Sequence, residues 1–119
     1  MTFCVEMETP SGLIARMQTD GIEYRHYHIT KHAIQRFTER VTTAIDEIFI
    51  SLDRVVLADI QQQKDHRVQD QIRRAERNGG YVLCDPETDV FFFVAMAGRL
   101  NAICTVMTLS QMMYLNKPR

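Results

Sequence analysis

The stretch VFFFVAMA, residues 90–97, decides the fold because every position in it is apolar. A half-exposed strand alternates apolar and polar side chains, whereas a strand that is covered on both faces is apolar throughout. Residues 90–97 are therefore predicted to form a central strand with both of its faces buried.

Two further β-rich segments flank this strand. YVLCD, residues 81–85, precedes it across the turn sequence PETD, and AICTVMTL, residues 102–109, follows it across the turn at residues 98–101. Short connections between such segments favour antiparallel pairing of neighbours. The C-terminal part of the chain is therefore predicted to be a three-stranded antiparallel meander.

The N-terminal part also has strand character. LIARMQ, residues 13–18, and IEYRHYHI, residues 22–29, are rich in β-branched and aromatic side chains, and the Asp20-Gly21 pair lies between them. Asp-Gly between two such segments is a hairpin signal, because both residues tolerate the backbone angles that a tight turn needs. We expect one N-terminal β-hairpin.

Two helices are predicted between these β regions. Thr30 can cap the first helix, whose apolar residues recur every three or four positions, namely Ile34, Phe37, Val41, Ile45 and Ile48. The second spans residues 51–78, with a break near Gln62, and the Gly79-Gly80 pair suits its C-terminal end. The fold class is thus α+β, with both helices packed on one sheet face.

Length and charge limit the organisation and the partners. A chain of 119 residues with 45% hydrophobic content can bury one core, which predicts a single domain over residues 1–119. Fourteen Lys and Arg oppose fifteen Asp and Glu, giving a net charge of −1. The chain is therefore no general polycation, and any phosphate must be bound by a local patch.

The cysteines and the apolar segments bear on localisation. The three cysteines are far apart, odd in number and without a C-x-x-C unit. No apolar run reaches the roughly 20 residues of a membrane-spanning helix. We expect a cytoplasmic protein with reduced thiols and no membrane contact.

A row of cationic or titratable residues marks the first helix. His32, Arg36 and Arg40 recur at a spacing of four, so they lie along one flank beside the apolar stripe. His32 can exchange a proton near neutral pH, and the two arginines can hold a phosphodiester. The alternative is a solvated helix face, which amphipathic helices often have.

Two segments together suggest a family. The helix TKHAIQRFTERV, residues 30–41, followed by GGYVLCDPETDVFFFVAMAGRLNAICTVMT, residues 79–108, resembles small bacterial and phage proteins related to the RelE and barnase-like ribonuclease toxins. The likeness covers residues 28–109 and leaves the N-terminal hairpin unmatched. It implies a toxin-like endoribonuclease that needs no metal or cofactor, acts on RNA and has an antitoxin as a partner.

The resemblance also implies roles for single residues. His32 becomes the acid or base in an attack of the 2′-hydroxyl on phosphorus, Arg36 and Arg40 become phosphate clamps, and Thr105 adds a strand hydroxyl. Thr108 faces the opposite side of its strand from Thr105. The near-neutral charge departs from the basic surfaces of many such toxins, which leaves open a non-catalytic phage or mobile-element protein that binds and modulates a host protein or nucleic acid.

Other polar residues extend the hypothesis. The histidines of HYHITKH, residues 26–32, could form a metal site, but no carboxylate or cysteine accompanies them, so we favour no metal. His26 and His28 share one strand face in this interpretation. The candidate nucleic-acid-binding residues are His28, Lys31, Lys64, Arg67, Arg73, Arg74 and Arg77. A solvated face is the alternative for residues 64–78, because acids are interspersed there.

The tail LSQMMYLNKPR, residues 109–119, contains an apolar cluster around Met112 and Met113. Such a cluster either docks on the core or forms a patch for self-association or a partner. Core packing is the favoured interpretation. The oligomeric state does not follow from the sequence.

Overall fold

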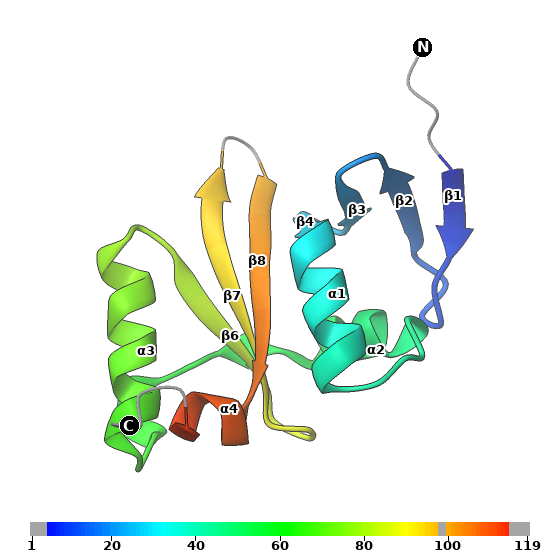
Figure 1. Cartoon of the computed structure of the whole chain (residues 1–119). Coiled ribbons are helices and arrows are strands. Elements are labelled where there is room, and N and C mark those ends of the chain that lie inside the picture. Colours follow the sequence, from blue (N-terminus) through cyan, green and yellow to red (C-terminus); the bar gives the residue numbers. More distant parts are fainter. Residues whose placement is uncertain (1–4, 98–99, 115–119) are drawn as a thin grey trace.

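The computed structural model describes residues 5–97 and 100–114 (Figure 1). Cys4, the first part of the predicted turn at residues 98–101 and the end of the apolar tail lie outside the described residues. The strands are β1 (Val5–Glu8), β2 (Ile14–Gln18), β3 (Gly21–Tyr24), β4 (Tyr27–Thr30), β5 (Val56–Leu57), β6 (Tyr81–Asp85), β7 (Val90–Ala97) and β8 (Leu100–Thr108). The helices are α1 (Lys31–Arg40), α2 (Asp46–Arg54), α3 (His66–Arg77) and α4 (Leu109–Tyr114), with a 3₁₀ turn at Ile60–Gln62.

The strands of the described part form one eight-stranded mixed sheet in the order β1-β2-β3-β4-β8-β7-β6-β5. Neighbouring strands are antiparallel except β4 and β8, which pair in parallel with His28 opposite Ala102. The α+β class and the meander of β6, β7 and β8 are confirmed. No helix in the described residues is long and apolar enough to cross a bilayer.

The helices cover both faces of the sheet, so the prediction of helices on one face is wrong. Val90, Phe92 and Val94 of β7 pack with α1 and α2, whereas Phe91 on the other face packs with α3 and α4. Figure 1 shows α1 and α3 on opposite sides of β7 and β8. The all-apolar β7 needed this double cover, and its predicted burial on both faces is confirmed.

The N-terminal region has three hairpin connections, β1–β2, β2–β3 and β3–β4, where one hairpin was predicted. The predicted turn between β2 and β3 is confirmed by the pairing of Gln18 with Gly21. The segment IEYRHYHI is itself split into β3 and β4 by a turn at Arg25, whose φ is +56°. β1 adds a further strand at the edge of the sheet.

The helices are shorter than the apolar periodicity predicted. Thr30 caps α1 as expected, because its hydroxyl accepts a hydrogen bond from the Ala33 amide. α1 ends at Arg40, before the β-branched run of residues 41–43, which lowers helix propensity. Residues 51–78 are divided among α2, β5, the 3₁₀ turn and α3, whose N-cap is Asp65.

The C-terminal apolar cluster docks on the core as favoured. Met112 of α4 is fully buried, and Met113 packs partly against the same cluster under α3.

Candidate nucleic-acid interface

Helix α1 lies along the edge of β8 that β4 leaves free. β4 ends at Thr30, and the Thr30 hydroxyl donates to the Ile103 carbonyl at 2.8 Å. Further along, the Arg40 guanidinium donates to the Val106 carbonyl, also at 2.8 Å. Ile103 is the last residue of β8 that pairs with β4, so Arg40 satisfies a carbonyl beyond the end of that pairing. The hydrogen bonds of Thr30 and Arg40 hold α1 against β8. The predicted row of His32, Arg36 and Arg40 lies on this helix.

His32, Arg36 and Arg40 all lie on α1, but they differ in exposure and in hydrogen bonding. His32 is exposed and makes no hydrogen bond to any other described residue. Arg36 forms an ion pair of 2.8 Å with Glu39, and this hydrogen bond is the main reason why the pKa of Glu39 is lowered. Both side chains of the pair are partly exposed, so a phosphate can compete for Arg36 at little cost. Arg40 is half-buried, and one of its N–H groups is used on β8.

Thr105 faces the same side of the sheet as α3. It pairs with Phe93, and Phe93 packs in the cluster under α3. Cys104 is the extra residue of a β-bulge, because Val94 pairs with Ile103 while Phe93 pairs with Thr105. Thr108 remains on the opposite face, as predicted, where it pairs with Val90.

His28 shares the face of Thr105. It pairs with Ala102, which in turn pairs with Ala95, and Ala95 alternates with Phe93 along β7. Over this area the sheet is only partly covered: Cys104 is exposed, and His28 and Thr105 are half-buried. We name the surface formed by His28, Ala102, Cys104 and Thr105 the β4–β8 strip. The flank of α1 borders it along the β8 edge.

The predicted basic residues of α3 lie on the same side of the sheet as the strip. The Arg67 side chain makes two hydrogen bonds to Asp65, and the pKa of Asp65 is lowered to about 2, chiefly by this contact. Arg73 lies 3.6 Å from Asp70. Arg74 and Arg77 are exposed and form no ion pair with any described residue, so they are available to a phosphate.

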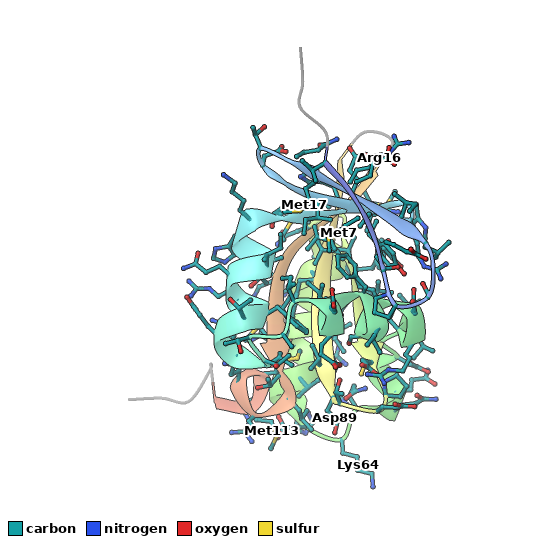
Figure 2. The ribbon with its side chains drawn as sticks, turned by 90° about the vertical axis from the view of Figure 1, so that its right-hand side faces the viewer. Met7, Arg16, Met17, Lys64, Asp89 and Met113 are labelled. Carbon is teal, nitrogen blue, oxygen red and sulfur yellow. The ribbon has the colours of Figure 1, made fainter. Side chains whose placement is uncertain are left out.

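The two predicted lysines, Lys31 and Lys64, do not lie on α3 with these arginines. Lys31 is exposed at the first position of α1. Lys64 projects into solvent at the end of the molecule away from the N-terminal hairpins and Arg16 (Figure 2). Lys64 therefore does not join a compact basic patch.

Acidic residues limit the surface on the other side of the strip. Asp20 lies 3.6 Å from His28, and Glu23 pairs with His28 across β3 and β4. These carboxylates would repel a phosphate over the N-terminal hairpins.

The histidines of residues 26–32 differ in their surroundings. His26 lies in the turn between β3 and β4 and stacks on Tyr27, with ring centroids 4.2 Å apart. It therefore does not share a strand face with His28, and that expectation is wrong. Within the described residues, no three His, Cys, Asp or Glu side chains are grouped so as to hold a metal ion.

The sequence interpretation missed a buried carboxylate. Asp85 is fully buried and accepts hydrogen bonds from the hydroxyls of Ser51 at 2.6 Å and Thr88 at 2.9 Å, and from Arg54 at 2.8 Å. Burial raises the pKa of Asp85, but these hydrogen bonds and one from the Glu87 amide outweigh it and lower the pKa overall. The polar DPETD turn was the available signal. Its role is to tie the β6–β7 turn to α2.

No family model matches the chain, and neither a curated protein nor a solved structure matches it.

Proposed function

We propose that the chain binds RNA over the β4–β8 strip and cleaves it without a metal. The observation that carries the proposal is the parallel pairing of β4 with β8, which puts His28 and Thr105 on one partly open face of the sheet. Helix α1 lies at the β8 edge of this face, where Arg40 bonds to Val106. Arg74 and Arg77 of α3, which form no ion pair with any described residue, lie on this side of the sheet and can contact phosphate.

His32 is the residue assigned to proton transfer. The 2′-hydroxyl attacks the adjacent phosphorus, the bond to the 5′-oxygen breaks, and a 2′,3′-cyclic phosphate and a 5′-hydroxyl are left. His32 takes the proton of the 2′-hydroxyl or gives one to the leaving oxygen. His32 is exposed, so its imidazole ring is accessible to an RNA chain.

Arg36 and Arg40 are assigned to the charge that develops on phosphorus. Arg36 can exchange the Glu39 carboxylate for a phosphate oxygen, since both are anionic acceptors. Arg40 keeps one N–H on Val106 and has others left to donate. Thr105, on β8, supplies a hydroxyl that can hydrogen-bond to the RNA.

The test is incubation of the purified protein with total RNA in the presence of a chelator, followed by analysis of the fragment ends. Wild type should give cyclic-phosphate ends, and His32→Ala should lower the rate by about 100-fold or more. His66→Ala is the matched control, because His66 is also an exposed histidine near a helix N-terminus but lies on α3. Intact RNA with wild type, or equal rates for wild type and His32→Ala, would overturn the proposal.

A second candidate is a non-catalytic protein that binds a protein partner through the N-terminal hairpin. In the β1–β2 hairpin, Val5 is 57% exposed and pairs with Met17, which is 43% exposed, so these two apolar side chains lie on one face. Figure 2 places Met7 and Met17 together on this hairpin. Such a grouping is typical of interaction surfaces. A pull-down that captures one protein at fixed stoichiometry with wild type and not with Met17→Glu, with no RNA cleavage, would support this candidate.

A further inference from the structure

A small groove lies beside the β4–β8 strip, between the end of α3 and strands β7 and β8. Its volume is about 180 Å³. Its lining includes Ala75, Asn78, Gly80, Phe93, Ala95 and Cys104. Cys104 belongs to both the groove and the strip, so the two surfaces are continuous.

The backbone gives the groove its shape. A Cβ on Gly80 would lie 2.2 Å from the Val94 carbonyl oxygen, so β6 can approach β7 this closely only with glycine here. The Gly80 amide donates to the Ala75 carbonyl at 2.9 Å, which holds the end of α3 at the wall. The bulge at Cys104 forms the opposite wall.

The lining is apolar with a single amide. Phe93 offers an aromatic side chain, Ala75 and Ala95 offer small apolar walls, and Asn78 is able both to donate and to accept hydrogen bonds. Arg74 and Arg77 lie within one turn of Asn78 and have no acidic partner in the described residues. A flat apolar group with a polar edge, attached to a phosphate, fits this combination.

We propose that the groove holds one nucleobase of single-stranded RNA. The inference rests on the RNA binding proposed above and assigns a base subsite to it. The base lies against the apolar walls, Asn78 hydrogen-bonds to its edge, and Arg74 or Arg77 contacts the adjoining phosphate.

The groove lies near the point where the chain enters α1. Cys104 directly follows Ile103, whose carbonyl accepts the hydrogen bond from Thr30. Thr30 comes immediately before α1, so the groove and the start of α1 both lie near Ile103, on opposite faces of the sheet. An RNA strand with a base in the groove reaches α1 by passing around the edge of β8.

The test uses the full chain and a fluorescent 2′-O-methyl oligonucleotide, which cannot be cleaved by 2′-hydroxyl attack. Ala95→Leu fills the groove from an exposed strand position. Ala44→Leu is the matched control, since Ala44 is exposed between α1 and α2. Ala95→Leu should weaken binding about tenfold and Ala44→Leu should not. Thermal melting by circular dichroism verifies that both variants fold.

A second measurement reads the groove directly. In a Cys4→Ser background, the alkylation of Cys104 by iodoacetamide is followed by mass spectrometry with the oligonucleotide and with an abasic oligomer of the same length. The base-bearing oligomer should slow alkylation several-fold, and the abasic one should not. Cleavage of RNA by wild type, together with unchanged binding by Ala95→Leu and no protection of Cys104, would overturn the base subsite and leave the function standing. Absence of any RNA binding or cleavage would overturn both.

Discussion

The guanidinium of Arg40 lies 2.8 Å from the carbonyl oxygen of Val106 and joins α1 to β8. Its place in the sequence row suggested a phosphate clamp, yet it also replaces the strand partner that β8 lacks after β4 ends. Arg40 thus has a structural task that Arg36, four residues earlier, does not have.

Arg40→Ala should therefore lower the free energy of unfolding by about 1–3 kcal/mol, because the carbonyl of the buried Val106 loses a charged donor. Arg36→Ala should cost less than about 1 kcal/mol, since it breaks only a partly exposed ion pair. Urea unfolding of the two variants measures the difference. Equal losses would mean that the bond to Val106 contributes nothing beyond a surface contact.

The central strand and the local caps could be predicted because they depend on neighbouring residues. An all-apolar β7 requires cover on both faces, and a hydroxyl at Thr30 satisfies an amide at the start of α1. Neither inference needs knowledge of the distant chain.

The turn at Arg25 could not be predicted in this way. Its positive φ is costly for a non-glycine residue, and the contacts that hold it are distant. The Arg25 side chain donates to Asp53 at 2.9 Å, and Asp53 also accepts from the Tyr24 hydroxyl at 2.7 Å. Asp53 lies on α2, so this turn depends on tertiary structure.

The candidate site was predictable only in part for the same reason. The row on α1 follows from a spacing of four, but the face of Thr105 depends on the bulge at Cys104 and on its pairing with Phe93. The juxtaposition of His28 with β8 depends on the parallel β4–β8 pair, which joins segments more than 70 residues apart. No periodicity in the sequence encodes such a crossover.

Gly80 and Gly79 offer a matched pair of glycine substitutions. Gly79→Ala should cost about 1–2 kcal/mol, because its φ is +85° but no atom lies within 4 Å of the added Cβ. Gly80→Ala should cost more, because its Cβ would clash with the Val94 carbonyl and push β6 from β7. Thermal unfolding of both variants measures this order. A reversed order would show that the backbone yields at Gly80.

The two described cysteines should differ in reactivity. Burial raises the pKa of the Cys84 thiol to about 11, with smaller contributions from Asp89 and Asp85, whereas Cys104 is exposed. In a Cys4→Ser variant at pH 8, a thiol-specific disulfide reagent should modify Cys104 rapidly and Cys84 only after denaturation, because the thiolate is the nucleophile. Peptide mass spectrometry identifies the modified site. Rapid modification of Cys84 in the native protein would contradict its partial burial and its raised pKa.

Asp85 should make the fold sensitive to acid. Its folded-state pKa lies below the ordinary value of 3.8, so its ionised form stabilises the protein above that pH and the contribution is lost as the pH falls through the lower, folded-state pKa. Asp85→Asn should flatten the dependence of unfolding free energy on pH below about 5. At pH 7 the same variant should lose roughly 3 kcal/mol of unfolding free energy, since Arg54 loses a buried partner.

Glu87→Gln is the control: Glu87 also bonds to Arg54 but is 66% exposed, so its removal should change neither the stability at pH 7 nor its dependence on pH appreciably. Denaturant titrations from pH 2 to 7 compare the three proteins, and parallel pH curves for wild type and Asp85→Asn would place the acid-sensitive group elsewhere.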